Sequence, residues 1–290
     1  MTASGLFREL PPPLRPGRPA SDEQRERRAM TPPPPLPAGA RFETVAGTPC
    51  LVAAGEKPVC RVIHMHGGAY YLGSAALWGD FASRYAAAAE AEVWVPDYPL
   101  APEHPFPAAL HAMIAVIEAL VAADPTVPLF LSGDSAGGGL ALALATLMRR
   151  PLPFAGIVLF SPWLDLTVTS AGYARCAETD TMFSEASARK GVDAYLQGAD
   201  PHHPLASPLF ADIAGLPELT LMISTDEVLA DEAMSLAQRL LHARVPFQLH
   251  AVPGVPHVWP MLAPGSVHSG QALATLGHLF RQNLARREAP

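Results

Sequence analysis

An apolar run, a serine between glycines and a second apolar run follow one another from Leu129 to Leu140. The segment reads L-F-L-S-G-D-S-A-G-G-G-L, so Gly133 and Gly137 stand two residues on either side of Ser135. Glycines allow the sharp turn by which a buried strand passes directly into a helix, and they let the two elements pack closely. The sequence therefore predicts a strand, a turn at Ser135 and a helix, which is a unit of α/β folds.

The chain on both sides of this unit alternates between strand-like and helix-like segments. Short apolar runs predict strands at residues 61–65, 92–96, 128–132, 156–160, 220–224 and 247–252. Longer patterns with helical spacing predict helices at residues 77–90, 107–123, 136–149, 229–243 and 267–285. This order is typical of a mainly parallel central sheet flanked by helices on both faces. We therefore predict an α/β fold with one catalytic domain over residues 46–290.

Two segments depart from this alternation. Residues 1–45 contain two proline runs, and between them Ser21 and Gln24 form a capping-box pattern that predicts a short helix over 21–30. Residues 161–219 connect two predicted strands without a clear crossover helix, and so long a connection is usually functional. We interpret 1–45 as an N-terminal arm or cap segment and 163–215 as a cap insertion near the carboxyl edge of the sheet, where such folds bind ligands.

Composition excludes several classes of function. The chain carries 20 Lys and Arg against 27 Asp and Glu, a net charge of −7, and has no long basic run, so we expect no nucleic-acid partner. The 3 cysteines are widely spaced and predict neither a disulfide framework nor a metal site. We also expect no membrane span and a cytoplasmic location, because no secretory leader or long apolar stretch is visible.

A serine hydroxyl becomes a nucleophile only with a base beside it and donors for the oxyanion that forms. The run H-M-H-G-G-A-Y ends a predicted strand well before Ser135 and resembles the loop that supplies such donors. We assign the backbone N–H groups of Gly67, Gly68 and Ala136 to the oxyanion hole. We expect His66 to brace this loop.

The base should follow the last predicted strand, because α/β hydrolases carry serine, acid and histidine in that order. His257 lies in the loop P-G-V-P-H-V-W directly after that strand, whereas the other late histidines fall in strand or helix patterns. The acid should follow the preceding strand, where the loop T-D-E-V-L-A-D-E offers four carboxylates. Asp226 and Glu227 are the candidates that this reasoning leaves open, since either can hold an imidazole in its working tautomer.

Three motifs together resemble the hormone-sensitive-lipase-like esterases of the α/β-hydrolase fold. They are H-G-G-A at residues 66–69, D-Y-P-L-A-P-E-H-P-F-P-A-A at 97–109 and G-D-S-A-G-G at 133–138. The resemblance implies an α/β-hydrolase core with a helical cap, hydrolysis of short-chain acyl esters, no cofactor and a possible homodimer. The family pattern of an acid followed by x-Leu-x-Asp selects Glu227 rather than Asp226. The chain departs from the family at Ala69, where glycine is usual, and at Pro99, where arginine is usual.

Several other residues could contribute to the site. Asp134 neighbours Ser135, so its side chain should point away and have a structural hydrogen-bonding role. Six aromatic residues could line a substrate pocket: Tyr70, Tyr71, Trp78, Trp163, Phe183 and Trp259. Of these, Tyr70 and Trp259 are the pocket candidates, because each adjoins a proposed catalytic loop.

The expected reaction is hydrolysis of a small carboxylic ester through an acyl-enzyme, with Ser135, Glu227 and His257 as the triad. The same triad could instead deacetylate acetylated amines or amides. A third alternative is a hydrolase-like scaffold that binds a small molecule without turning it over. Such proteins usually lack the serine or the histidine, and this chain has both.

Overall fold

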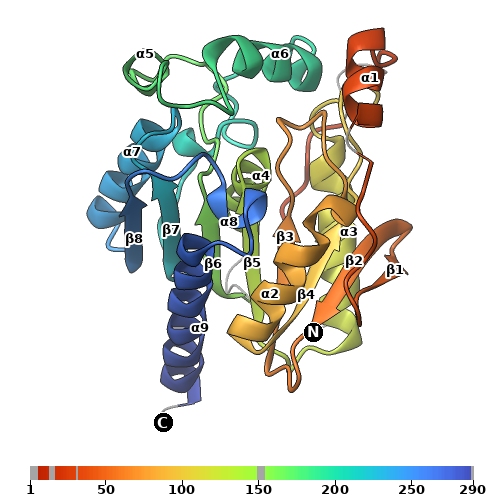
Figure 1. Ribbon diagram of the computed structural model, residues 1–290, viewed down its shortest axis with the longest axis vertical. Coiled ribbons are helices and arrows are strands. Elements are labelled where there is room, and N and C mark those ends of the chain that lie inside the picture. Colours follow the sequence, from red (N-terminus) through yellow and green to blue (C-terminus); the bar gives the residue numbers. More distant parts are fainter. Residues whose placement is uncertain (1–5, 13–16, 31, 149–153, 289–290) are drawn as a thin grey trace.

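The computed structural model describes residues 6–12, 17–30, 32–148 and 154–288. Within them, an eight-stranded sheet runs through the centre of the molecule in the order β1-β2-β4-β3-β5-β6-β7-β8 (Figure 1). The strands are β1 (Arg41–Val45), β2 (Thr48–Ala54), β3 (Cys60–Met65), β4 (Ala91–Pro96), β5 (Leu129–Asp134), β6 (Phe154–Phe160), β7 (Leu219–Ser224) and β8 (Phe247–Val252). β3 to β8 are parallel to one another, and β2 is antiparallel to both of its neighbours.

The six predicted strands are all present as β3 to β8, which confirms the α/β fold class. β5, β6 and β7 are buried along their whole length, as strands covered by helices on both faces must be. The hairpin β1–β2 was not predicted. It turns at Ala46 and Gly47, which both have positive φ. β1 therefore belongs to the sheet, although it lies before residue 46, where the catalytic domain is predicted to begin.

Helices cover both faces of the sheet (Figure 1). One face carries α2 (Gly79–Ala89) and α9 (Val267–Glu288), which pack against each other and share a core with β4. The other face carries α3 (Ala108–Ala123), α4 (Ala136–Leu147) and α7 (Ala230–His242), whose apolar side chains form a second, larger core. The sheet therefore separates two hydrophobic layers, and its strand ends are free to carry a site.

The remaining elements are short or lie above the sheet. α1 (Asp22–Met30), α5 (Gly172–Arg175) and α6 (Glu185–Leu196) lie together at the top in Figure 1, and three single-turn helices complete the fold: η1 (Ala75–Trp78), η2 (Pro208–Phe210) and α8 (Trp259–Leu262). α1 has the predicted capping box, because Gln24 N donates to Ser21 Oγ at 3.2 Å and Ser21 N donates to Gln24 Oε1 at 2.9 Å. Lys190 Nζ of α6 lies 2.9 Å from Glu23 Oε1 of α1, which ties the two helices together.

Candidate active site

The turn between β5 and α4 holds Ser135 in a strained conformation. Its φ of 52° and ψ of −122° are rarely adopted by residues with a side chain, and such strain is typical of functional turns. A Cβ atom at Gly133 would lie 2.3 Å from Gly137 O, and one at Gly137 would lie 2.0 Å from Met65 O. Only glycine fits at either place, so both glycines allow the close packing that the turn needs. Ser135 N donates to Phe160 O at 2.9 Å and fixes the turn to β6.

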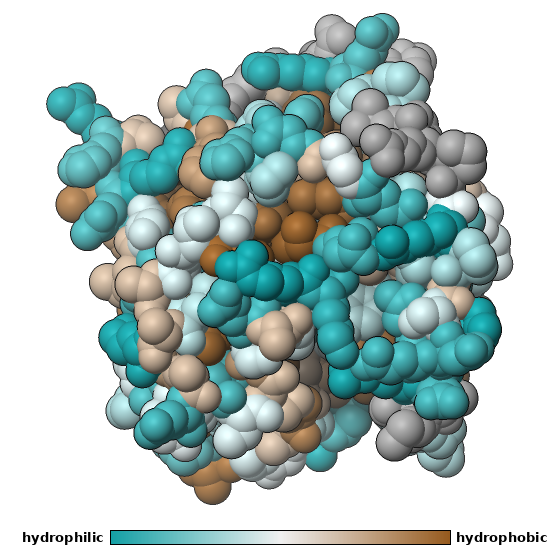
Figure 2. All heavy atoms as spheres, turned by 90° about the horizontal axis from the view of Figure 1, so that it is seen from above, coloured by the Kyte–Doolittle hydropathy of each residue, from teal (hydrophilic) through white to brown (hydrophobic). Residues whose placement is uncertain are grey.

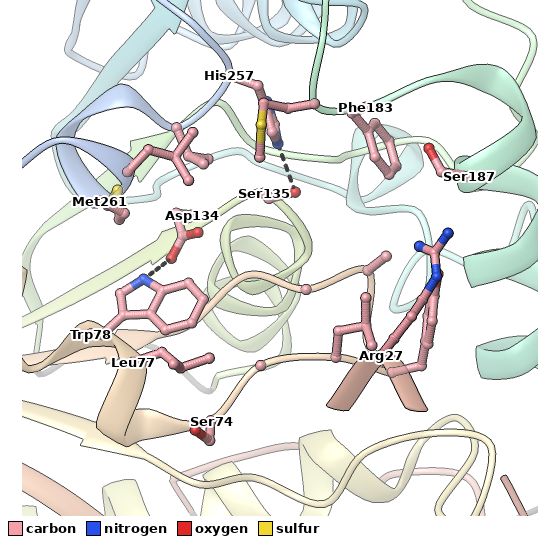
Figure 3. A pocket seen from close by; sticks show the side chains of 18 of the residues that line it. Arg27, Ser74, Leu77, Trp78, Asp134, Ser135, Phe183, Ser187, His257 and Met261 are labelled. Atoms are coloured by element: carbon pink, nitrogen blue, oxygen red, sulfur yellow. Dashed lines mark hydrogen bonds between the residues drawn. The ribbon is translucent and has the colours of Figure 1, made fainter. Parts of the chain in front are cut away.

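A chain of hydrogen bonds joins Ser135 to the two loops that follow β7 and β8. Ser135 Oγ lies 3.0 Å from His257 Nε2, and His257 Nδ1 lies 2.7 Å from Glu227 Oε2. Figure 3 shows the first of these contacts, with His257 above Ser135. The three side chains are 6%, 6% and 1% exposed in the order Ser135, His257 and Glu227, so water competes little for these bonds. The structure thus brings together three residues that are far apart in the sequence.

Asp226, the alternative acid, lies outside this chain. Its Oδ2 accepts a hydrogen bond from Gly254 N at 2.8 Å, and its Oδ1 accepts one from Thr225 Oγ1 at 3.1 Å. Glu227 instead turns inward, where its Oε1 accepts a hydrogen bond from Ser224 N at 3.3 Å. Asp226 therefore fastens the β7 loop to the β8 loop, and Glu227 is the carboxylate that reaches the imidazole.

The environment of His257 acts on its proton affinity in two directions. Burial lowers the pKa of His257, because the imidazolium loses its hydration. The hydrogen bond that His257 donates to Glu227 and the negative charge of that carboxylate together raise it by more, so that the pKa of His257 stands above its ordinary value. The site therefore stabilises the imidazolium that would form if His257 accepted a proton from Ser135.

The loop after β3 departs from the predicted oxyanion hole at one residue. The N–H of Gly67 donates to Asp134 Oδ1 at 3.0 Å and is therefore not free to bind an oxyanion. Gly68 and Ala69 follow with φ values of 122° and 50°, and both line the cavity in front of Ser135. Their N–H groups, like that of Ala136, have no hydrogen-bond acceptor among the described residues.

Asp134 is the anchor of this loop. Besides Gly67 N, its Oδ1 accepts hydrogen bonds from Trp78 Nε1 at 2.9 Å and, as the acceptor of an imidazole N–H, from His64 Nε2 at 3.0 Å. The His64 ring is buried, and its Nδ1 lies 2.9 Å from Ser132 Oγ. The predicted structural role of Asp134 is confirmed by these bonds, and the carboxylate links the turn at Ser135 to the loop opposite.

His66 braces the loop from its other side, as predicted. Its Nδ1 lies 2.7 Å from Gly67 O, and its ring stacks on Tyr98 with centroids 4.4 Å apart. Tyr98 Oη donates to His66 O at 2.6 Å. Burial lowers the pKa of His66, so this imidazole stays neutral and has a packing role.

Helix α6 packs directly on the loop. Tyr195 stacks face to face on Tyr70 with centroids 3.9 Å apart. A Cβ atom at Gly191 would lie 3.2 Å from both Cβ and O of Ala69, so the glycine leaves room for the alanine that departs from the family pattern. The methyl group of Ala69 is thus accommodated by α6.

A cavity of about 650 Å³ opens in front of Ser135. Seen from above in Figure 2, brown apolar atoms form the floor of a hollow that hydrophilic side chains surround. The apolar side chains that line the cavity are Pro33, Tyr71, Leu72, Leu77, Trp78, Met182, Phe183, Val258, Met261 and Leu262. The polar side chains that line it are Arg27, Arg28, Ser74, Asp134, Ser135, Ser187 and His257. A cavity of this size and lining suits a small, mainly apolar ligand.

Tyr70 and Trp259, the two predicted pocket aromatics, do not line this cavity. The ring of Tyr70 is buried under α6, and Trp259 is 2% exposed in the core between α2 and α9. This corrects the prediction. Tyr70 and Trp259 adjoin the catalytic loops in sequence, but their side chains are buried in the core. Three of the other four aromatic residues line the cavity instead: Tyr71, Trp78 and Phe183.

Other kinds of site are absent from the described part of the chain. No group of three or more His, Cys, Asp or Glu residues there could hold a metal ion. Cys50, Cys60 and Cys176 are free and buried, and burial raises the pKa of the first two thiols to about 12. Among the described helices, none has both the length and the apolar character needed to cross a membrane.

Known proteins are similar to this chain in sequence and in fold. The model of a family described as having the alpha/beta hydrolase fold matches residues 62–261. An acetyl-hydrolase of Streptomyces hygroscopicus is 36% identical over 224 residues, 76% of this chain and 75% of that protein. An esterase of Acinetobacter venetianus is 35% identical over 74% of this chain and 72% of that protein. The crystal structure of an esterase from the bacterial hormone-sensitive lipase family matches with a TM-score of 0.83 and 34% identity over 92% of this chain and 93% of that one. The chain therefore belongs to the alpha/beta hydrolase fold family, among its hormone-sensitive-lipase-like serine carboxylesterases.

Proposed function

We propose that the enzyme hydrolyses carboxylic esters by transient acylation of Ser135. The observation that carries this proposal is the buried chain from Ser135 Oγ through His257 to Glu227, with contacts of 3.0 and 2.7 Å. A nucleophile, a base and a carboxylate that orients the base are the parts that acyl transfer from an ester requires. The relatives named esterase and acetyl-hydrolase support the same reaction class.

Each proposed step has a residue that performs it. His257 Nε2 takes the proton of Ser135 as Oγ attacks the ester carbonyl, and Glu227 stabilises the resulting imidazolium. The same imidazolium then protonates the leaving alcohol, which departs and leaves an acyl group on Oγ. Water enters, gives a proton to His257 and attacks the acyl carbonyl, and the acid leaves as Ser135 regains its proton.

The N–H groups of Gly68, Ala69 and Ala136 are the proposed oxyanion donors. Gly68 and Ala69 line the cavity, and Ala136 is the first residue of α4, where the helix dipole also favours negative charge. Each such donor typically lowers the barrier by about 2.7–4 kcal/mol. Ala69 replaces Gly67 in the assignment, because Gly67 N–H is held by Asp134.

We propose short-chain acyl esters as the substrates, with a cap that limits their length. Side chains from both predicted cap segments line the cavity, Arg27 and Arg28 from 1–45 and Phe183 and Ser187 from 163–215. These segments therefore restrict the space over Ser135. Rates on p-nitrophenyl esters from acetate to decanoate should be highest at the short end, and a maximum at the long end would contradict this assignment.

Acetyl transfer from an amide is the second candidate, because one relative is named an acetyl-hydrolase. The proposed mechanism needs only that His257 protonate the leaving group, which can be an amine. Side-by-side rates on an acetate ester and the matching acetamide separate the two candidates. We expect the ester to be preferred, since alcohol is the better leaving group.

Replacement of the nucleophile tests the proposed mechanism. Ser135→Ala should lower kcat/KM for p-nitrophenyl acetate by more than about a thousandfold, because the acyl group then has no acceptor on the protein. Ser235→Ala, the same change at an exposed position of α7 that does not line the cavity, is the matched control. Hydrolysis by Ser135→Ala within about tenfold of the parent would rule out this mechanism.

A further inference from the structure

Arg27 contributes a positive charge to the cavity that the proposed mechanism does not use. It lies in α1 and lines the cavity together with Ser135 and His257. Figure 3 shows it on the side opposite Met261, with its guanidinium group near Ser187. Its side chain is 49% exposed, so a ligand in the cavity can reach it.

The other charged groups around the cavity are already committed to partners in the protein. Arg28 donates to both oxygens of Glu103, at 2.8 and 3.1 Å, and to the carbonyl oxygens of Tyr71 and Ala101 at 2.9 and 2.7 Å. Asp134 is 1% exposed and accepts three hydrogen bonds through Oδ1, while its buried Oδ2 has no hydrogen-bond partner among the described residues. These groups hold the cap and the oxyanion loop in place, and they offer little to a ligand.

Arg27 differs because its terminal Nη donors have no hydrogen-bond partner among the described residues. Its contact with a charged partner is that of Nε with Glu23 Oε1, which are 3.5 Å apart. Glu23 itself accepts a hydrogen bond from Lys190 Nζ at 2.9 Å, and this bond lowers the pKa of Glu23. No hydrogen bond from the guanidinium group of Arg27 is formed within the described residues.

The residues that line the cavities around Arg27 include more cations than carboxylates, although the whole chain has a net charge of −7. A second cavity of about 390 Å³ lies between α1 and α6, and Arg27 and Tyr71 line both cavities. The charged residues around this second cavity are Arg18, Glu23, Arg27, Lys190 and Asp193. Arg18 pairs with Asp193 and Lys190 pairs with Glu23, so three cations share two carboxylates and Arg27 has the longest of these contacts.

We propose that Arg27 binds a carboxylate carried by the ester substrate, so that the enzyme prefers esters with a free acid group at one end. The proposal rests on the ester hydrolysis proposed above and adds the substrate class. A guanidinium group presents two parallel N–H donors that match a carboxylate, and the bonds are charge-assisted. The apolar wall of Leu72 and Tyr71 would cover the chain between the carboxylate and the reacting carbonyl.

Two pairs of esters test this preference. In the first pair the monomethyl ester of glutaric acid, with its carboxylate on the acyl side, is compared with the same ester whose carboxylate is replaced by a carboxamide. In the second pair the acetate ester of hydroxypropionic acid, with its carboxylate on the alcohol side, is compared with its carboxamide. The members of each pair match in shape and differ in charge, so the ratio of their kcat/KM values measures the effect of the carboxylate charge on hydrolysis.

The parent enzyme should favour the carboxylate over the carboxamide in at least one pair, and Arg27→Gln should lower that ratio by about tenfold. Arg27→Lys should retain part of the preference, because it keeps the charge but loses the paired donors. Arg189→Gln is the control. Arg189 lies on α6, pairs with Glu185 and does not line the cavity, so the ratio should stay at the parent value.

The outcomes separate this proposal from the proposed function. Hydrolysis of both members of each pair at equal rates, unchanged by Arg27→Gln, would overturn the role of Arg27 and leave ester hydrolysis intact. An equal fall of the ratio in Arg189→Gln would show general electrostatic attraction and would also overturn it. Absence of hydrolysis of every ester, including p-nitrophenyl acetate, would instead contradict the function on which it rests.

Discussion

Oε2 of Glu227 lies 2.7 Å from Nδ1 of His257, and its Oε1 accepts the N–H of Ser224 at the end of β7. The carboxylate is therefore fixed at both oxygens and is 1% exposed. Asp226, one residue earlier, binds Gly254 N at 2.8 Å instead. Two adjacent carboxylates after β7 therefore have different roles. Glu227 binds the imidazole of His257, and Asp226 joins the β7 loop to the β8 loop.

Glu227→Gln should change both the rate and its pH dependence. Neutral His257 is the base, and Glu227 raises the pKa of His257 above its ordinary value of 6.5. In the parent, kcat/KM should therefore fall on the acid side with an apparent pKa above 6.5. Glutamine removes the charge while burial still lowers the pKa of His257, so the acid limb should move to lower pH. The plateau should fall on the order of 10³- to 10⁴-fold, because the amide can favour the wrong tautomer.

Asp226→Asn is the matched control for that experiment. It removes one charge from the same loop, but Asp226 has no contact with His257. The acid limb should stay within a few tenths of a pH unit of the parent, and the plateau should remain within about tenfold. If the acid limb moved in Asp226→Asn and not in Glu227→Gln, the acid of the triad would be Asp226, and the assignment of Glu227 would be wrong.

Gly191→Ala should reduce activity through the oxyanion loop. The new Cβ would lie 3.2 Å from Ala69 Cβ and 3.1 Å from Trp163 Cη2, which is too close without a shift. Because alanine favours a helix over glycine by about 1 kcal/mol, α6 itself should not be weakened. We expect kcat/KM for p-nitrophenyl acetate to fall about tenfold, since small displacements of oxyanion donors are costly.

Ala69→Gly in the Gly191→Ala background should restore part of that loss, because the contact of the new Cβ with Ala69 Cβ is removed while the contact with Trp163 Cη2 remains. A double-mutant cycle measures this coupling, which is typically about 0.5–3 kcal/mol for residues in contact. Gly270→Ala is the control, because a Cβ atom there meets nothing within 4 Å. Strictly additive effects of the two site changes would contradict the proposed contact between α6 and the loop.

Asp134→Ala should lower kcat more than it raises KM. The alanine leaves Gly67 N and Trp78 Nε1 without their acceptor, so the oxyanion loop and one wall of the cavity lose a common anchor. Loss of one aligned oxyanion donor would cost about a hundredfold in kcat. Asp134→Asn keeps an acceptor oxygen and should lose much less. Equal losses in the two variants, or a change in KM alone, would count against this role.

In Glu232→Gln, the free energy of unfolding should fall less with rising pH than it does in the parent. Glu232 is 2% exposed, and burial raises its pKa well above the usual value although its Oε2 accepts the N–H groups of Leu164 and Asp165. A carboxyl with a raised folded-state pKa contributes stability below its unfolded pKa and loses it as pH rises toward the folded value. Glutamine mimics the neutral acid and does not titrate.

Urea unfolding at several pH values tests this expectation. The free energy of unfolding of Glu232→Gln relative to the parent should rise above pH 4.5, the ordinary pKa of the group, by up to about 1.4 kcal/mol per pH unit. At pH 4.5 and below, where Glu232 is neutral in the folded parent, Glu232→Ala should be less stable than the parent, because it leaves two buried N–H groups unpaired. A difference between the glutamine variant and the parent that does not vary with pH would contradict the raised pKa.

Strands β3 to β8 could be predicted because each is a short apolar run that ends at a turn signal. The hairpin β1–β2 could not, since β1 is largely exposed and β2 contains Pro49, which weakens a strand pattern. Its antiparallel pairing with β4 depends on contacts between residues that are far apart in sequence.

Within the site, Ser135 and His257 could be found from their loops, because chain order and turn residues restrict them. The engagement of Gly67 N–H could not, because its acceptor on Asp134 lies 67 positions away. Ring direction is equally invisible in the sequence. Tyr70 points under α6 toward Tyr195, while Trp78, in the turn before α2, lines the cavity.

Labelling with a fluorophosphonate tests the central claim, that Ser135 is the nucleophile, most directly. Attack by Oγ would form an O–P bond and release fluoride, and peptide mass spectrometry would locate the adduct. A single adduct on the peptide containing Ser135 is expected, with esterase activity lost in proportion to labelling and no adduct in Ser135→Ala. An adduct on another residue that accompanies the loss of activity, or full activity after Ser135 is modified, would contradict the account.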